Sequence, residues 1–305
     1  MSEAIDKAFT ALGFAHRPIH SYLKPMIEAF VASGAADKNY LTELGSGVEG
    51  QFWSRAWEAM LYWRFNEQGW SVSGPGAGPD LLIKTADRDV LVEASLPAPD
   101  GLPPEWLKFE PNVVKSMPHE AMLLRWTSKL RDKRKKHLED IEKGHADAKT
   151  PFVIAINSKR LGYFPEENGI SQWPFAVEAT FPIGPWAVPI DPETKEMGKA
   201  YQSLRFSIAK KPGVDIPTDN FLDPDYACVS ALIGCAACYA EEAVCAKFGG
   251  QPPYFIVHNP LATNPLPVGW LPNAIEYAAT REGDDEFTLS RLTPRVNAAR
   301  HSLQT

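Results

Sequence analysis

The sequence predicts an α/β fold in which a mixed central β-sheet is flanked by helices. Three features predict it: two adjacent apolar runs within residues 80–95, a long amphipathic stretch over 119–146, and the apolar run of 151–156. Strands that alternate with a long helix are typical of a sheet whose faces are covered by helices. The 305 residues contain no internal repeat and no convincing linker, so we expect one elaborated domain.

Two helices are expected ahead of the sheet. Residues 3–34 have apolar side chains at helical spacing, namely Ile5, Phe9, Leu12, Ile19, Leu23 and Phe30. Ser46 and Glu49 have the spacing of a capping box, which predicts that a second helix starts there. That helix should run to about Gln68, and Gly69 is placed to stop it.

A β-hairpin is the strongest strand prediction. Residues 80–84 and 89–95 carry the apolar runs of strands that are covered on both faces. A short strand is expected at 70–73, and the glycine- and proline-rich segment 74–79 predicts a loop before the hairpin. Six prolines between residues 97 and 118 predict a long irregular crossing after it.

The remaining elements follow the hairpin. Residues 119–146 predict a long helix that is basic in its middle, and residues 151–156 predict a buried strand. Beyond residue 160 the patterns weaken, with further strands or buried elements expected at 204–208, 226–233 and 254–258.

The single domain is expected to have three parts. Residues 1–45 form a helical cap, residues 46–160 form the core, and residues 161–305 form an extension that completes the sheet. Two roles stay open for the first forty residues, a dimerisation arm or a cap on the core. A homodimer is therefore one of the assemblies considered.

Composition excludes several classes of function. The net charge of −7 argues against a generic polyanion binder, so local charge must decide the partners. No run of about 18 apolar residues exists, so no membrane span is expected. The first residues lack the apolar core of a signal peptide, and all four cysteines fall within residues 228–245, so reduced thiols in the cytoplasm are expected.

Three acidic residues are candidates for one site. Glu93 interrupts an apolar strand, and a buried carboxylate costs several kcal/mol unless it is paired, protonated or bound to metal. Asp80 opens the preceding strand, and antiparallel pairing can place it beside Glu93. Glu58 lies at the edge of the apolar stripe of its helix. A turn aspartate at Asp80 and a solvated glutamate at Glu58 are the alternatives.

Together these residues resemble the PD-(D/E)xK superfamily of restriction-endonuclease-like nucleases. The resemblance covers residues 50–157 and rests on Glu58, on Asp80 after a proline, on Glu93, and on the basic helix and buried strand that follow. It implies a restriction-endonuclease-like core with elaborations at both ends. It also implies that Asp80 and Glu93 hold Mg²⁺, or alternatively Mn²⁺, with Glu58 contributing, and that the substrate is nucleic acid, most often DNA.

One residue departs from the superfamily's pattern. Ser95 stands two positions after Glu93, where the family normally has a lysine that stabilises developing charge. Either the site is inactive, or another cation replaces that lysine. Lys129 and Lys133 lie on one flank of the long helix and are the candidates, since some members of the superfamily carry this lysine on a nearby helix.

The basic helix is also the expected surface for nucleic acid. Residues 125–137 hold seven lysines and arginines against one acid. Contacts with phosphates are expected from Arg125, Ser128, Arg134 and Lys136. The alternative is an ordinary solvated helix face.

Three functions are therefore carried forward. The first is a Mg²⁺-dependent nuclease, and the second is a catalytically inactive module of the same fold that binds nucleic acid or protein. The third is an unrelated α/β enzyme with a site around His258, which follows the apolar run 254–257. The Cys235/Cys238 pair has apolar surroundings, so small buried thiols are expected rather than a zinc or redox site.

Overall fold

An eight-stranded mixed β-sheet forms the centre of the protein, which confirms the predicted fold class. The computed structural model describes residues 1–74, 76–108, 110–162, 169–235, 254–283 and 286–292. Across the sheet the strands are β1 (Ser71–Ser73), β2 (Leu81–Lys84), β3 (Asp89–Ser95), β4 (Phe152–Asn157), β9 (Ala231–Cys235), β10 (Tyr254–His258), β11 (Ile275–Arg281) and β12 (Phe287–Leu292). The predicted extension after residue 160 thus supplies half of the sheet.

The strand directions explain why the sheet is mixed. The β1–β2, β2–β3, β9–β10 and β11–β12 pairs are antiparallel. The β3–β4, β4–β9 and β10–β11 pairs are parallel. Parallel neighbours need a crossover connection, and the long helix between β3 and β4 provides one.

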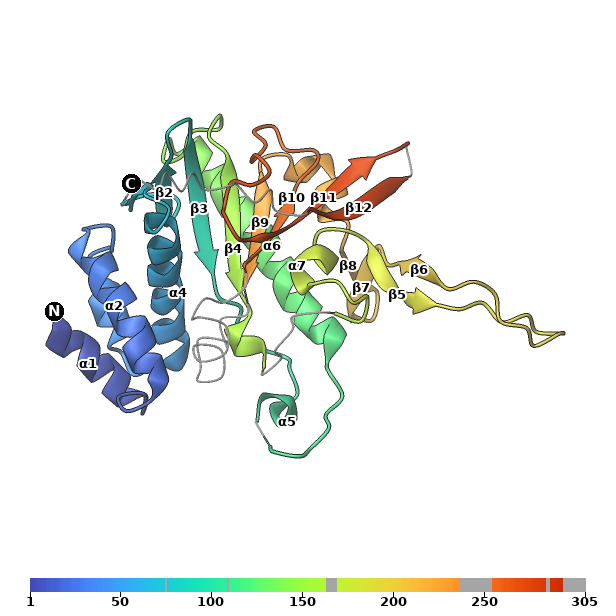
Figure 1. The fold of residues 1–305 in the computed structure, drawn as a ribbon, viewed down its shortest axis with the longest axis horizontal. Coiled ribbons are helices and arrows are strands. Elements are labelled where there is room, and N and C mark those ends of the chain that lie inside the picture. The colour runs from blue at the N-terminus through green and yellow to red at the C-terminus, as the bar shows by residue number, and fades with distance from the viewer. Residues whose placement is uncertain (75, 109, 163–168, 236–253, 284–285, 293–305) are drawn as a thin grey trace, which may run out of the picture.

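Helices cover both faces of this sheet (Figure 1). One layer consists of α1 (Ser2–Ala11), α2 (Pro18–Ala32), α3 (Tyr40–Leu44) and α4 (Glu49–Asn66). The other layer contains α6 (His119–Glu142) and α7 (Phe175–Glu178), and the short α5 (Pro104–Leu107) lies in the crossing before α6. Val90 and Val92 of β3 face the first layer, whereas Leu91 faces the second, as expected for a strand that is covered on both sides.

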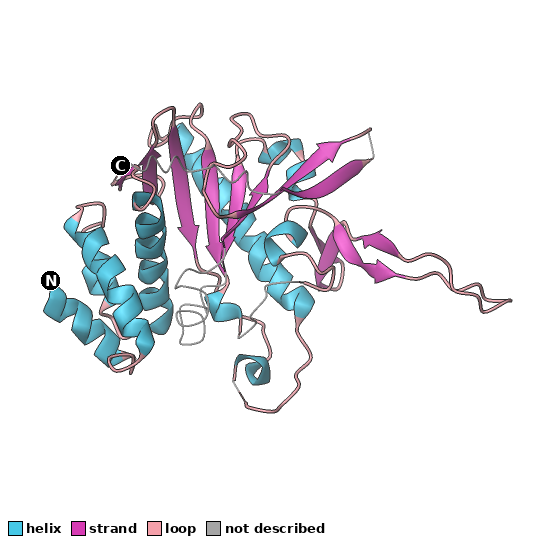
Figure 2. Ribbon diagram, viewed as in Figure 1, coloured by secondary structure: helices cyan, strands magenta, loops and turns pink. Residues whose placement is uncertain are grey.

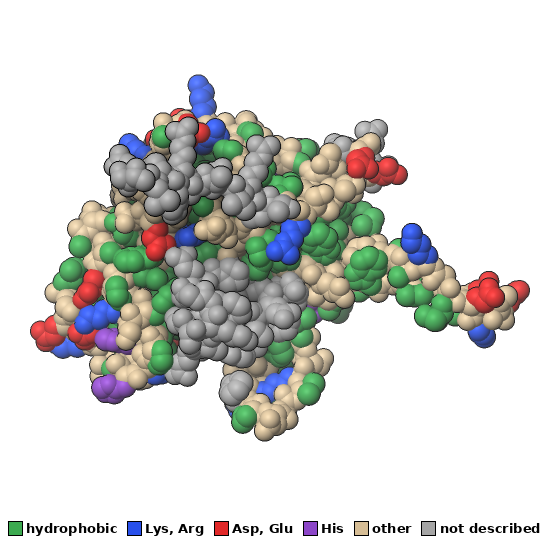
Figure 3. All heavy atoms as spheres, in the orientation of Figure 1, with side chains coloured by type: hydrophobic (Ala, Val, Ile, Leu, Met, Phe, Trp, Pro, Cys, Tyr) green, Lys and Arg blue, Asp and Glu red, His purple; other side chains and the backbone are tan. Residues whose placement is uncertain are grey.

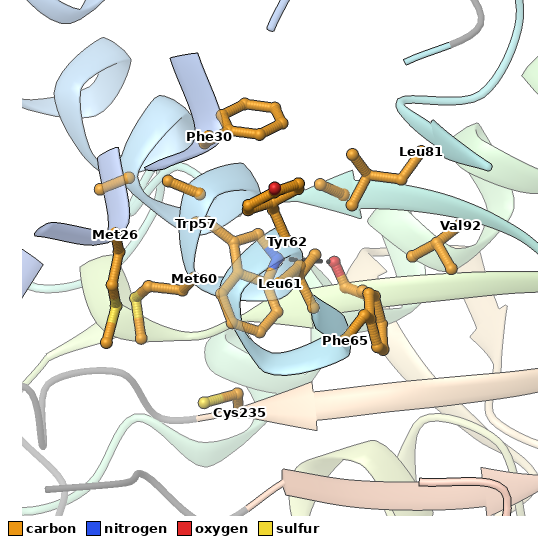
Figure 4. Close-up of a cluster of buried hydrophobic side chains, with 14 of the residues drawn as sticks. Met26, Phe30, Trp57, Met60, Leu61, Tyr62, Phe65, Leu81, Val92 and Cys235 are labelled. Carbon is orange, nitrogen blue, oxygen red and sulfur yellow. Dashed lines mark hydrogen bonds between the residues drawn. The ribbon is translucent and has the colours of Figure 1, made fainter. Parts of the chain in front are cut away.

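The central part of α4 is packed between the sheet and α2. Trp57 is fully buried, and its Nε1–H donates to the carbonyl oxygen of Ala155 in β4 at 3.0 Å. Figure 4 shows its neighbours on both sides, which are Met26, Phe30, Leu61, Phe65, Leu81 and Val92. This packing fixes the rotation of α4, and with it the direction of Glu58, the next residue along the helix.

Two small antiparallel ribbons lie outside the main sheet (Figure 2). One pairs β5 (Ile183–Ala187) with β6 (Tyr201–Leu204), and the other pairs β7 (Ser207–Lys211) with β8 (Val214–Pro217). The described residues also form three short 3₁₀ helices: η1 (Lys159–Leu161), η2 (Asn220–Leu222) and η3 (Pro224–Tyr226).

Two predictions about the N-terminal helices are wrong. The expected single helix over 3–34 is two helices, because Gly13 adopts a left-handed backbone with φ of 71° and Pro18 begins a new helix. The capping box at Ser46 does not form. Val48 is the N-cap residue of α4, and the Ser46 hydroxyl accepts a hydrogen bond from the Val48 amide instead. Gly69 does take a positive φ, of 75°, in the turn after α4.

The hairpin, the long helix and the strand after it lie close to where the sequence predicts them, but one weaker prediction fails. The expected strand at 204–208 is interrupted at Arg205 and Phe206, which separate β6 from β7. Arg205 binds Glu178, 27 positions away, and local patterns do not encode such a contact. The expected buried element at 226–233 is largely present, since Tyr226 and residues 229–233 are buried, and β9 starts within it at Ala231.

Gly234 in β9 provides a test of this packing. A Cβ atom there would lie 2.9 Å from the Cβ of Ala176 and 3.2 Å from Cη2 of Trp126, both in the α6 layer. We therefore expect Gly234→Val to destabilise the protein by about 1–3 kcal/mol, and Gly234→Ala by less, because overpacking forces side chains out of place. Urea unfolding measures both, and a valine variant as stable as the wild type would contradict the arrangement of α6 on the sheet.

Candidate active site

Asp80 and Glu93 lie opposite each other at one end of the β2–β3 hairpin. Leu81 pairs with Val92 in the antiparallel register, so the next step outward places Asp80 across from Glu93. Residues that are directly opposite in an antiparallel pair share a face of the sheet. For this pair it is the face covered by α6, since the alternate residue Leu91 belongs to that core.

Asp80 is held in place by the backbone around it. Its Oδ2 accepts a hydrogen bond from the Ala94 amide at 2.8 Å. Gly78, two residues earlier, has φ of 91°, and a Cβ atom there would lie 2.6 Å from the carbonyl oxygen of His145. Only glycine suits this position. The loop 74–79 therefore serves to deliver Asp80 to the end of the hairpin.

Glu93 is buried and is neutralised by two lysines of α6. Its side chain is 2% exposed. Lys133 Nζ donates to Oε1 at 2.6 Å, and Lys136 Nζ donates to Oε2 at 2.7 Å. Lys136 also donates to the carbonyl oxygen of Gly78 at 3.0 Å and lies 3.6 Å from Asp140. These bonds supply the pairing without which a buried carboxylate would be strongly destabilising.

Glu58 belongs to α4, in the layer on the other face of the sheet, and its link to the pair is the charge of Asp80. Arg55 Nη1 donates to its two carboxylate oxygens at 3.0 and 2.9 Å, and this arginine also binds Asp37 and Glu43. Burial, followed by the charge of Asp80, raises the pKa of Glu58 to about 8, although Arg55 acts in the opposite direction. One guanidinium shared among three acids leaves Glu58 incompletely compensated.

The charge of Glu93 likewise affects Asp80. Burial and then the neighbouring Glu93 raise the pKa of Asp80 to about 6, despite the lowering effects of Lys133, Lys136 and the Ala94 amide. Glu58 is thus repelled by Asp80, and Asp80 by Glu93. Carboxylates perturbed in this way by burial and by one another are typical of functional sites.

The donor atoms suit a hard divalent cation, but several of them are already engaged. Among the described residues, no three His, Cys, Asp or Glu side chains stand in position to hold a metal ion. Both oxygens of Glu93 are bound by lysines and both oxygens of Glu58 by Arg55, whereas Oδ1 of Asp80 has no hydrogen bond to the part of the chain described. Carboxylate oxygens are the ligands that Mg²⁺ and Mn²⁺ prefer. For Glu93 to bind a metal ion, Lys133 or Lys136 would have to move away from its carboxylate.

Lys129 lies close to where the lysine missing at Ser95 would have acted. Helix α6 joins two parallel strands, so it runs antiparallel to β3. Lys129 is one turn before Lys133, about 6 Å along the helix, and Ser95 is two residues beyond Glu93, about 6.6 Å along the strand. Lys129 therefore lies near the level of Ser95, is half-buried and has no ion pair with a described residue. The Ser95 hydroxyl is buried and has no hydrogen-bond partner among those residues.

The residues predicted to contact phosphate are not all free to do so. Arg134 donates to the carbonyl oxygen of Asp225 at 2.5 Å and lies over the ring of Tyr226, and Lys136 binds Glu93. Arg125 and Ser128 are half-buried, and Arg125 borders a surface groove of about 680 Å³ at the start of α6.

Sequence reasoning missed two partners of the site. Arg55 lies three residues before Glu58 on the same helix, and this spacing is a local signal that could have identified the pair. The Gly78 carbonyl group that binds Lys136 gives no signal in the sequence, because the two residues are 58 positions apart.

The alternative centre at His258 is a closed structural contact. Its Nε2 lies 2.8 Å from Oε2 of Glu276, whose oxygens also accept hydrogen bonds from the Gly269 amide. Cys228 is half-buried with a free thiol and Cys235 is buried, whereas Cys238 and Cys245 lie outside the described residues. The contacts of Glu276 with His258 and with the Gly269 amide tie the loop after β10 to β11.

The raised pKa of Glu58 predicts a pH-dependent stability. An acid whose pKa rises on folding, here from 4.5 to about 8, binds more protons in the folded state over that range, so stability falls as the pH rises through it. Glu58→Gln should reduce the loss of unfolding free energy between pH 5 and pH 8 by about 1 kcal/mol or more. Urea unfolding at several pH values measures this.

The matched control is Glu49→Gln, at the exposed start of the same helix. It should leave the pH dependence unchanged. If the unfolding free energies of the wild type and of Glu58→Gln fell equally with pH, the raised pKa of Glu58 would be contradicted.

Comparison with known proteins finds no match: no family model matches the chain, and neither curated proteins nor solved structures contain a similar one. None of the described helices is long and apolar enough to cross a membrane.

Proposed function

We propose that the protein is a Mg²⁺-dependent nuclease of the PD-(D/E)xK superfamily and that it acts on nucleic acid, with DNA as the expected substrate. One observation carries the proposal. The charge of half-buried Asp80 acts on buried Glu58, the charge of buried Glu93 acts on Asp80, and Lys133 lies 2.6 Å from Glu93. These interactions support the set of acids and the nearby lysine that the resemblance implies. The lysine would come from α6, because Ser95 occupies the position where the superfamily normally has it.

Each carboxylate has a role in this proposal. Asp80 and Glu93, on one face of the hairpin, would hold the metal ion, and Glu58 would complete the set from α4. When bound, Mg²⁺ lowers the pKa of a bound water and stabilises charge on the scissile phosphate. The mutual repulsion that raises the pKa values of Glu58 and Asp80 would be relieved by a cation, which favours binding.

Lys133 would supply the positive charge beside the scissile phosphate. Its bond to Glu93 holds the ammonium group next to the carboxylate pair, where it can offset negative charge that develops during hydrolysis. Lys129, near the level of Ser95, is the second candidate for the same role. Arg125, Lys129 and Lys133 are spaced four residues apart, so they follow one flank of α6 and could contact successive phosphates.

The alternative is an inactive module of the same fold that binds nucleic acid or protein. The observation that favours it is the double pairing of Glu93, whose two oxygens are both bound by lysines. In that case the lysines would serve stability alone. For either function we propose the cytoplasm as the compartment, because the half-buried Cys228 is a free thiol.

Cleavage assays test the nuclease directly. With Mg²⁺ or Mn²⁺, the wild type should cut at least one of single- and double-stranded DNA and RNA. Asp80→Asn and Glu93→Gln should abolish cleavage, and Lys133→Ala should reduce it by about 10²-fold or more, the usual loss for one charge-stabilising group. Lys135→Ala is the control, since its side chain on the same helix is 78% exposed and pairs only weakly with Glu139, at 3.8 Å. Cleavage that survives Asp80→Asn would contradict the assignment.

Metal-dependent stability separates the nuclease from the inactive module. A ligand that binds only the folded state at a hundred times its Kd adds about 2.7 kcal/mol of stability. Saturating Mn²⁺ should therefore raise the melting temperature of the wild type but not that of Asp80→Asn. No shift in the wild type, together with no cleavage, would favour the inactive module.

A further inference from the structure

The ribbon of β5 and β6 continues into a long arm, residues 182–206, which projects away from the body of the protein (Figure 1). Hydrogen bonds hold its two sides together towards the tip. The Gly198 amide donates to the carbonyl oxygen of Pro189 at 2.8 Å, and the Asp191 amide donates to that of Glu196 at 3.0 Å. The two sides of the arm are therefore paired by backbone hydrogen bonds beyond the ends of β5 and β6.

A buried network anchors the root of the arm. The Arg205 amide donates to the carbonyl oxygen of Pro182 at 2.9 Å, and its guanidinium donates to Glu178 at the same distance. Glu178 is fully buried and also binds His119 of α6 and the hydroxyl of Ser171. A buried carboxylate with this many partners makes a rigid attachment.

The arm carries an unusual share of the exposed apolar side chains. Seven of the fifteen large apolar residues that are exposed in the described parts of the chain lie within it: Trp186, Val188, Ile190, Met197, Tyr201, Leu204 and Phe206. Their exposed fractions range from 41% for Val188 to 71% for Met197. Figure 3 shows hydrophobic side chains along the arm and charged ones towards its tip.

Several of these side chains form one stripe. Trp186, Val188 and Ile190 are at alternate positions, which share a face where the backbone is extended. Ile190 pairs with Met197 across the arm, so Met197 belongs to the same face. A two-stranded ribbon alone is marginal in water, and an exposed apolar patch of this kind marks an interaction surface.

We propose that this stripe packs against the same stripe of a second copy about a two-fold axis, which makes the protein a homodimer. In a two-fold dimer the same patch of each copy forms the interface, which is the usual geometry of homodimers. The four side chains of the stripe, which are about half exposed, offer roughly 450 Å² of apolar surface per copy if large apolar side chains bury about 150–250 Å² each, and just over half of a typical interface is apolar. A standard interface covers about 800 Å² per partner.

The charges on the arm favour an antiparallel arrangement of the two arms. The tip carries three exposed acids, Asp191, Glu193 and Glu196, against Lys195, whereas Lys210 and Lys211 are exposed on β7 just beyond the root. Antiparallel packing places the acidic tip of one arm near the basic root of the other. Opposite charges placed in this way fix the register of an interface.

Sedimentation velocity of the full chain tests the proposal. The wild type should sediment with twice the mass of one chain, and Ile190→Glu with Met197→Glu should give a monomer, with the dimer Kd raised by at least about 100-fold because two charges would be buried at the centre. Both positions are exposed, at 60% and 71%, so the folded chain tolerates the changes, which circular dichroism verifies. The control is Val268→Glu, an apolar residue 63% exposed outside the arm, which should remain a dimer.

A charge swap tests the antiparallel register. Lys210→Glu with Lys211→Glu should weaken the dimer, and adding Glu193→Lys with Glu196→Lys should restore it. A wild type that is monomeric at every concentration, or an Ile190/Met197 variant that stays dimeric, would overturn the proposal. A monomer that uses the arm to bind nucleic acid would overturn it as well. None of these outcomes depends on nuclease activity, so the two proposals fail separately.

Discussion

The pairing of buried Glu93 with Lys133 and Lys136 is the interaction on which the site depends. It joins the central strand β3 to helix α6 through bonds of 2.6 and 2.7 Å. Through Lys136 it also reaches the Gly78 carbonyl group, and so holds the loop that delivers Asp80. Strand, helix and loop are therefore fixed around one carboxylate, which explains how elements from distant parts of the chain form a single site.

The same arrangement leaves charge that is poorly compensated. Arg55 binds three acids at once, while the charge of Asp80 acts on Glu58 and that of Glu93 acts on Asp80. Apolar residues at Glu58 and Asp80 would give a more stable fold, since burial of incompletely paired charge is unfavourable. The repulsion that remains is the physical basis of the proposed metal site, because a divalent cation would relieve it.

The sequence predicts the elements whose patterns are local. The hairpin of β2 and β3 is predicted by two apolar runs. The contact of a lysine of α6 with the acidic residues is predicted by the helical spacing of Lys129, Lys133 and Lys136. Contacts between distant residues could not be predicted. Glu178 and Arg205 lie 27 positions apart, and their bond ends the expected strand at 204–208. The projection of the arm could not be predicted either, because apolar residues in a strand pattern have the same sequence whether they are buried or exposed.

We propose that Asp80 and Glu93 share a divalent cation beside Lys133. A crystal structure determined with Mn²⁺ would locate this cation through the anomalous signal of the metal. We expect a peak bound by both carboxylates, with at least one of Lys133 and Lys136 displaced from Glu93. Density without a peak at Asp80, with both lysines still bound to Glu93, would contradict it.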